Sequence, residues 1–226
     1  MENNKNKEYT KVYYEHFAKL TLKYFGYDIN SFIDGIEVEN PDLQNEKEQI
    51  GIEVVQAIFQ DMSDVIGYRN KFIKPSMSTE EIKNCFAEQG YENYVIIQNQ
   101  KFQGLGFELK FVHQVINRIC EQVKEKITKK QHYKVFANYG LYVFLDKYGS
   151  RLRLENIRTL WQEIKQIEDY KEFSYYYING YDNLFRINVN SEKIDDIEIT
   201  IPDWEKMNKQ ALLFERNEYN KAETNK

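Results

Sequence analysis

The segment 50–59, IGIEVVQAIF, constrains the fold of this chain more than any other part of its sequence. It is the most β-branched stretch of the protein, and β-branched side chains pack well on the pleated surface of a sheet. We therefore predict a central strand here, with the chain entering a helix near Ala57. Glu53 interrupts the apolar run, and a charged side chain is costly to bury without a partner or a metal ion. Either Glu53 belongs to a functional site, or it lies on an edge strand and faces water.

Helical and strand patterns alternate along the rest of the chain. Helices are predicted over about 8–25, from a capping box at Ser78 and Glu81 to Gly90, along the stripe Val112, Ile116, Ile119, Val123 and Ile127, and over 157–167. Strands are predicted over about 31–38, 94–98, 140–146, 173–178, 184–189 and 197–201, with Asn179-Gly180 as a hairpin turn and 104–106 as a plain turn. We expect the apolar stripe to pack onto the sheet.

This order of elements predicts an α/β or α+β protein with a central mixed sheet flanked by helices. The 226 residues are 42% hydrophobic and 15% aromatic, which argues against disorder. The sequence contains no visible repeat and no linker rich in Pro, Gly or Ser, so we predict a single domain over 8–214. The ends, 1–7 and 215–226, are dominated by Asn, Lys and Glu and are predicted to be flexible tails.

Composition and charge disfavour several classes of protein. No run of about 18 uncharged apolar residues occurs, and no apolar stretch follows the polar start of the chain, so we expect neither a membrane span nor a secretory signal. Cys85 and Cys120 lie far apart and are predicted to be free thiols in the cytoplasm. The net charge of −5 disfavours a protein that holds nucleic acid by a broad positive field, although local patches can act against it.

Two carboxylates come together if the chain forms a hairpin around the charged turn 44–48. Pro41–Leu43 and Ile50–Val55 would be its strands, and Asp42 and Glu53 would then point to the same end of the sheet. With the backbone carbonyl of Val54, they offer the hard oxygen ligands that Mg²⁺ or Mn²⁺ prefers. Such an ion can activate water and neutralise charge on a scissile phosphate. The alternative is that Asp42, which follows a proline, is only a turn residue.

At these residues the sequence resembles the PD-(D/E)xK nuclease-like superfamily. The family pattern is Pro-Asp, a short turn, then an acidic residue, one further residue and lysine, on a hairpin that packs against a first helix. Pro41-Asp42 matches the first half, and Glu53 matches the acidic residue of the second half. The first helix of the family often contributes a glutamate, and Glu15 falls at the expected place. The alternative for Glu15 is a solvated helix position.

The resemblance implies a restriction-endonuclease-like core over about 9–146 with an insertion over about 61–106, followed by a C-terminal helix and hairpin extension. It also implies a hydrolase that acts on DNA or RNA with a bound metal ion. The chain departs from the pattern at Val55, which stands where the family has the lysine that orients or deprotonates the attacking water. Some members relocate that lysine. Here the adjacent Gln56 is expected to face the other side, and Lys126 is placed to reach across from its helix.

Other signals are weaker and have ordinary structural explanations. His16, His113 and His132 are scattered and are not expected to bind zinc. Tyr175–Tyr177 can stack on nucleic-acid bases, or they belong to an ordinary half-exposed strand. The lysines of one helix end can track a phosphate backbone or simply complement the helix dipole: Lys124, Lys126, Lys129, Lys130 and the nearby Lys134.

Two hypotheses follow from the sequence. The first is a metal-dependent phosphodiesterase with Asp42 and Glu53 as metal ligands and Glu15 assisting. The second is a catalytically inactive scaffold of the same fold that binds a protein or a nucleic acid. Convergence of the carboxylates with an amine favours the enzyme, whereas convergence without one, or dispersal, favours the scaffold. Because valine replaces the lysine, we expect weak or undetectable nuclease activity, which Val55→Lys would raise.

Overall fold

The computed structural model of the protein describes residues 11–34, 41–74, 76–105, 111–130, 133, 135–145, 152–180 and 183–224. These residues belong to two compact units. The larger contains Tyr9–Ala57 and Phe111–Lys226, and the smaller contains Ile58–Lys110. The sequence predicts a single domain with an insertion over 61–106, and the structure makes nearly that insertion a unit of its own. Each unit is described by itself below.

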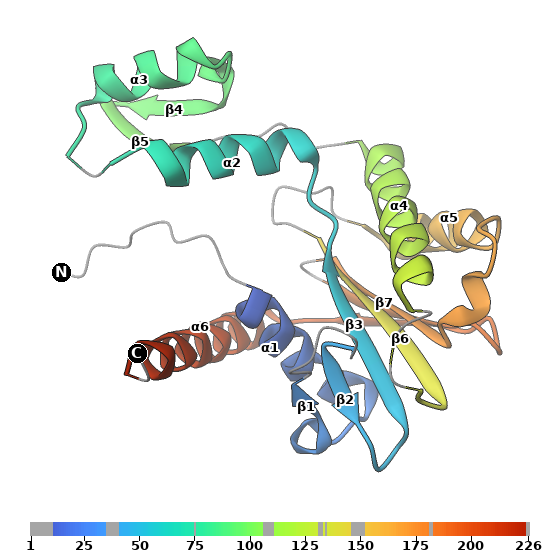
Figure 1. Ribbon diagram of the computed structural model, residues 1–226. Coiled ribbons are helices and arrows are strands. Elements are labelled where there is room, and N and C mark those ends of the chain that lie inside the picture. Colours follow the sequence, from blue (N-terminus) through green and yellow to red (C-terminus); the bar gives the residue numbers. More distant parts are fainter. Residues whose placement is uncertain are drawn as a thin grey trace. The chain divides into compact units, whose positions relative to one another are not determined.

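The described residues of the larger unit form a seven-stranded mixed sheet in the order β1-β2-β3-β6-β7-β8-β9 (Figure 1). Its strands are β1 (Ile33–Asp34), β2 (Leu43–Asn45), β3 (Ile50–Gln56), β6 (Asn138–Phe144), β7 (Tyr175–Asn179), β8 (Asn183–Asn188) and β9 (Ile194–Glu198). The pairs β3–β6 and β6–β7 are parallel, and the other neighbours are antiparallel. An α/β protein with a mixed sheet is therefore confirmed.

The strand β3 lies inside the sheet, between β2 and β6, as the apolar run predicts. The hairpin β2–β3 pairs Leu43 with Ile52, and both side chains are fully buried. Gly51 allows Pro41 to approach, because a Cβ atom at Gly51 would lie only 2.7 Å from Pro41 Cγ. The hairpin register therefore holds Pro41 and Asp42 directly against β3.

Helices cover both faces of this sheet (Figure 1). One face packs against α1 (Lys11–Leu22) and α6 (Ile201–Thr224) in a core that includes Ile52 and Val54. The other face carries Glu53, which contacts α4 (Val112–Lys130), and Tyr176, which contacts α5 (Leu154–Ile164). Short 3₁₀ turns lie at Lys23–Phe25, Ile29–Ser31 and Tyr170–Glu172. In α4 the predicted stripe is buried at Ile116, Ile119, Val123 and Ile127, which confirms that it packs inward.

The smaller unit contains α2 (Gln60–Phe72), α3 (Thr79–Glu88), a 3₁₀ turn (Glu92–Tyr94) and the antiparallel pair β4 (Val95–Gln98) and β5 (Lys101–Leu105). Val65, Ile82 and Phe86 form its core. The capping box of Ser78 and Glu81 is present as predicted. The plain turn predicted at 104–106 is wrong for Gly104 and Leu105, which end β5 beside a β-bulge, while residue 106 lies outside the described residues.

The C-terminal end of the chain differs most from the sequence-based expectation. The predicted edge strand 197–201 is β9, three residues earlier, and Ile201 already begins α6. Residues 215–224, predicted as part of a flexible tail, continue this helix, and Glu215 is buried. Contacts with α1 explain why this segment is helical. Tyr13 donates a hydrogen bond to Asn208, and His16 stacks on Phe214. Within the described residues, no helix has both the length and the apolarity needed to cross a membrane.

Candidate functional site

Asp42 and Glu53 are brought together by the hairpin register. Leu43 and Ile52 are direct partners, so Asp42 and Glu53 occupy the next facing positions. Asp42 Oδ2 accepts a hydrogen bond of 2.8 Å from the backbone N–H of Val54, which fixes its carboxylate against β3. Both residues are 5% exposed. The predicted edge-strand alternative for Glu53 is therefore wrong, because this carboxylate is buried in the interior of the sheet.

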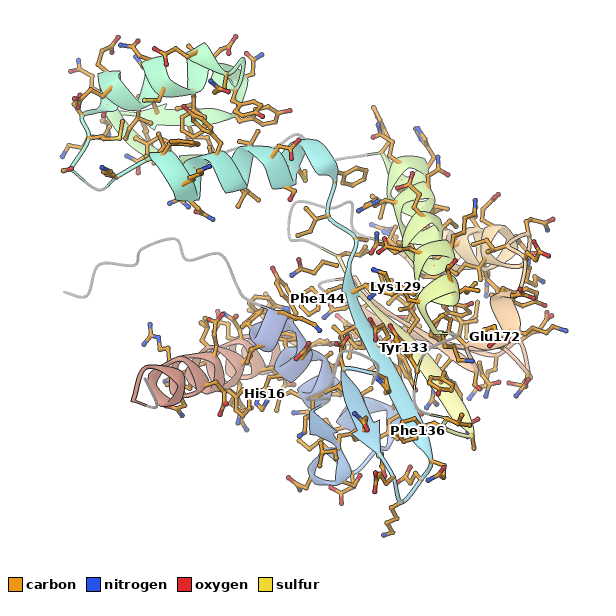
Figure 2. The ribbon with its side chains drawn as sticks, viewed as in Figure 1. His16, Lys129, Tyr133, Phe136, Phe144 and Glu172 are labelled. Carbon is orange, nitrogen blue, oxygen red and sulfur yellow. The ribbon has the colours of Figure 1, made fainter. Side chains whose placement is uncertain are left out.

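Lys126 reaches Glu53 from the facing helix. Its ammonium group donates a hydrogen bond to Glu53 Oε1 and forms an ion pair with it. The two side chains are 15% and 7% exposed, so this pair is largely shielded from water. Tyr133, which follows α4 in the chain, also acts to lower the pKa of Glu53. Figure 2 shows Tyr133 between α4 and the strands of the sheet.

On the opposite side, α1 contributes one cation and one carboxylate to the same cluster. Lys11 Nζ lies 2.7 Å from Asp42 Oδ1 and 3.2 Å from Glu15 Oε1. Glu15 is four residues after Lys11 in the same helix, so the two side chains share a face. Asp42 therefore lies between a lysine and a glutamate from α1 on one side and Glu53 with Lys126 on the other.

The cluster raises the pKa of two of its carboxyl groups. Burial and the nearby charge of Asp42 raise the pKa of Glu15 to about 7, against the opposing effect of Lys11. Burial and the charge of Asp42 also raise the pKa of Glu53, against the opposing effects of Lys126 and Tyr133. Although burial alone would lower it, hydrogen bonding and attraction to Asp42 raise the pKa of Lys11. Like charges a few ångströms apart disfavour ionisation, and a cation or a proton relieves them.

The donor chemistry at this site fits a hard divalent cation. Asp42 and Glu53 provide carboxylate oxygens, and the backbone carbonyl of Val54 adds a third oxygen from the same strand as Glu53. Among the residues that the structure describes, no group of three or more His, Cys, Asp or Glu side chains is arranged to hold a metal ion. A cation here would therefore take only two ligands from side chains and the rest from the main chain and water.

The structure thus brings together Glu15, Asp42, Glu53 and Lys126, as the sequence-based prediction placed them. Sequence reasoning missed Lys11 and Tyr133. Lys11 carried a usable signal, because it precedes Glu15 by one helical turn. Tyr133 carried none, because it lies far from Glu53 along the chain.

The weaker signals have structural explanations. Tyr176 and Tyr177 are fully buried, so these two do not offer free rings for base stacking. Lys129 and Lys130 form ion pairs with Glu125 and Glu172. His132 and Lys134 lie outside the described residues.

Comparison with known proteins does not identify this chain: no family model, no curated protein and no solved structure matches it.

Proposed function

We propose that this chain is a divergent PD-(D/E)xK-like phosphodiesterase that cleaves nucleic acid with a bound Mg²⁺ or Mn²⁺ ion. One observation carries the proposal: the ammonium group of Lys126 contacts Glu53 inside the carboxylate cluster. This contact supports the proposal that Lys126, which lies in α4, takes the role that the family's lysine has at the position of Val55. Val55 itself is buried, so an ammonium group introduced there would have to lose its hydration.

Asp42, Glu53 and the Val54 carbonyl are the groups that would hold the ion. When bound, the ion polarises the phosphate and lowers the pKa of a coordinated water molecule. Lys126 donates hydrogen bonds from a shielded position, where an ammonium group stabilises developing negative charge more strongly than it does in water. Tyr133 acts to lower the pKa of Glu53, which favours the ionised carboxylate. Glu15, with a pKa of about 7, is suited to exchange a proton with solvent at neutral pH.

A specific observation also favours the inactive scaffold. Lys11 and Lys126 already form ion pairs with Asp42 and Glu53, so both proposed ligands have a cation partner without a metal ion. In that case the protein would bind a nucleic acid or a protein partner without cleaving it. The two functions differ in whether a divalent ion competes with the lysines.

Cleavage of labelled single- and double-stranded DNA and RNA with Mg²⁺ or Mn²⁺ tests the proposal. We expect slow, ion-dependent cleavage by the natural sequence. Loss of one positioned acid or base typically lowers a rate by about 10²–10⁴-fold. The cleavage rates of Glu53→Gln and Lys126→Met should each be lower by this factor. Lys129→Met, which alters an exposed lysine of the same helix, is the matched control and should retain the rate. No ion-dependent cleavage of any substrate, or equal rates in Lys126→Met and the natural sequence, would refute the enzyme.

A further inference from the structure

The two oxygens of the Asp42 carboxylate have different partners. Oδ2 accepts the hydrogen bond from the backbone N–H of Val54, 2.8 Å away, which directs this oxygen toward β3. Oδ1 lies 2.7 Å from Lys11 Nζ. Oδ1 is therefore the oxygen that Asp42 offers to a cation, and the Lys11 ammonium group occupies it.

This ammonium group lies close to the position that a metal ion needs. Mg²⁺ binds carboxylate oxygens at about 2.0–2.1 Å, which is less than about 1 Å shorter than the distance from Oδ1 to Lys11 Nζ. Two cations on one oxygen repel each other, so a divalent ion that binds Oδ1 drives Lys11 away.

The two lysines of the cluster differ in how easily they can leave. The Lys11 side chain is 75% exposed, although the Asp42 side chain with which it pairs is only 5% exposed. Ion pairs with exposed lysines contribute little to stability, and the flexible stem of a lysine can turn its ammonium group into water. Lys126 is 15% exposed, so its departure from Glu53 would leave a buried carboxylate unpaired. Lys11 is therefore the exchangeable cation, and Lys126 is the fixed one.

The balance of charge in the cluster also favours exchange. Its three carboxylates face only the two ammonium groups of Lys11 and Lys126. When all of these groups are ionised, one negative charge is left uncompensated. A divalent ion in place of Lys11 supplies the missing positive charge, and clustered carboxylates are stabilised in this way.

We propose that Lys11 holds the cation position at Asp42 Oδ1 while no ion is bound and that a divalent ion displaces it, so that Lys11 sets the ion affinity of the cluster. The presence of a divalent-ion site rests on the proposed function. The exchange itself needs neither substrate nor turnover. It selects divalent over monovalent ions, because only a divalent ion brings more charge than the ammonium group that it replaces.

Titration with Mn²⁺ tests the exchange, with the paramagnetic resonance signal of the free ion as the readout. Lys11→Met should tighten Mn²⁺ binding by about tenfold, because the competing ammonium group is gone. Lys11→Arg keeps the competing charge and should bind Mn²⁺ within about twofold of the natural sequence. Asp42→Asn should abolish binding both alone and together with Lys11→Met, which locates the ion.

Lys23→Met is the matched control. It removes an exposed lysine from the 3₁₀ turn that directly continues α1, about 18 Å from Lys11 along the helix axis. This distance exceeds the Debye length at physiological salt, so the variant should change Mn²⁺ affinity by less than about twofold. Circular dichroism confirms that each variant is folded.

A second readout follows Lys11 itself. Limited acetylation, measured by mass spectrometry, reports how accessible each lysine amine is. An ammonium group paired with Asp42 is protonated and shielded, so saturating Mg²⁺ should raise the acetylation of Lys11 by about twofold or more. The acetylation of Lys23 in the same sample should not change.

The outcomes separate the exchange from the proposed function. Three results would overturn the exchange alone: equal Mn²⁺ affinity in Lys11→Met and the natural sequence, equal tightening in Lys11→Arg or Lys23→Met, or acetylation of Lys11 that does not change when the ion binds. Binding that tightens only in Lys11→Met, without any cleavage of nucleic acid, keeps the exchange and refutes the phosphodiesterase. Absence of Mn²⁺ binding in every variant refutes both.

Discussion

Two charged clusters in the larger unit both pair acidic with basic side chains, and they shift the pKa values of their acids in opposite directions. On β8 and β9, Arg186 and Asp195 are direct cross-strand partners, with Arg186 Nη2 and Lys193 Nζ 2.7 and 2.8 Å from the Asp195 carboxylate. Burial acts to raise the pKa of Asp195, but the hydrogen bonds from these cations lower it below its ordinary value. In the cluster on β3, the pKa values of Glu15 and Glu53 are raised instead.

The difference follows from the number of cations per carboxylate and from the position of each cluster in the sheet. Asp195 is one carboxylate with two cations on an edge strand, whereas Asp42 shares two lysines with two further carboxylates beside an interior strand. The first arrangement stabilises the ionised acid and is what a structural ion pair requires. The second arrangement raises the pKa values of its acids, so they are not fully ionised near neutral pH. Groups with strongly shifted pKa values occur preferentially at functional sites.

The largest contrast is expected from removing one lysine of each cluster. Lys126→Met leaves Glu53 buried without its ammonium partner, and breaking a buried pair should lower the free energy of unfolding by about 3 kcal/mol at pH 8. The side chain of Lys193 is 71% exposed, so Lys193→Met should lower the free energy of unfolding by less than about 0.5 kcal/mol. Denaturant titrations measure both. Losses of the same size in the two variants would show that the clusters do not differ.

Neutralising one acid of each cluster should change stability in opposite directions. The folded-state pKa of Glu15, about 7, lies above the ordinary value of 4.5, so the native state binds more protons than the unfolded chain between these values. Stability from this group is present below about pH 4.5 and is lost as the pH rises through 7. Discounted for solvent screening, Glu15→Gln should gain about 1–2 kcal/mol at pH 8 and flatten the pH profile.

Asp195→Asn is the counterpart of that change. The lowered pKa of Asp195 means that its ionised form stabilises the native state above the unfolded pKa, and this stability is lost as the pH falls. The variant should therefore lose about 1 kcal/mol at pH 8. Unfolding at pH 5 and pH 8 checks both signs. A loss of stability in Glu15→Gln at pH 8 would contradict the raised pKa.

A divalent ion should distinguish the clusters by thermal unfolding. At an ion concentration ten times the Kd, mass action adds about 1.4 kcal/mol, which is about 3–6 °C in the unfolding midpoint for a chain of this length. The shift should vanish in Asp42→Asn, which removes one ligand charge. It should persist in Asp195→Asn, which leaves the β3 cluster intact. An equal shift in all three proteins would mean that the ion does not bind at Asp42.

Removing Lys11 should change stability little but should shift a neighbouring pKa. Its side chain is 75% exposed, so Lys11→Met should change stability by less than about 1 kcal/mol. The pKa of Glu15 should nevertheless rise further, because Lys11 is the group that opposes burial and Asp42. Carboxyl chemical shifts in an NMR titration report this directly. An unchanged or lower Glu15 pKa in the variant would place Lys11 outside the cluster.

Local patterns in the sequence predicted the hairpin half of the site. The apolar run around Glu53 and the short turn after Asp42 fix strand pairing over a few residues, so both the elements and the facing carboxylates follow from the sequence. Lys126 was predicted only as one of two candidates, because its partner depends on how α4 packs on the sheet. Tyr133 depends on the same packing and left no local signal.

The helix α6 was missed because its polar composition resembles a solvated tail. A start signal was nevertheless present. Thr200 Oγ1 accepts from the backbone N–H of Asp203 in the first turn, and Pro202 lies in that turn, where its missing N–H is tolerated. Packing against α1 then stabilises the helix, and no periodicity within α6 alone reveals that partner.

The smaller unit lies in the chain between Glu53 and Lys126, and this has a consequence for the order of folding events. Asp42 and Glu53 belong to one short hairpin, whereas Glu53 and Lys126 are 73 residues apart. Contacts that close long loops cost more chain entropy and tend to form late. We therefore expect Lys126→Met to accelerate unfolding and to leave the refolding rate nearly unchanged. During folding, Asp42 and Glu53 would then come together before Lys126 contacts Glu53. The Lys126 contact would determine how long the native state persists and would have little influence on how fast it forms.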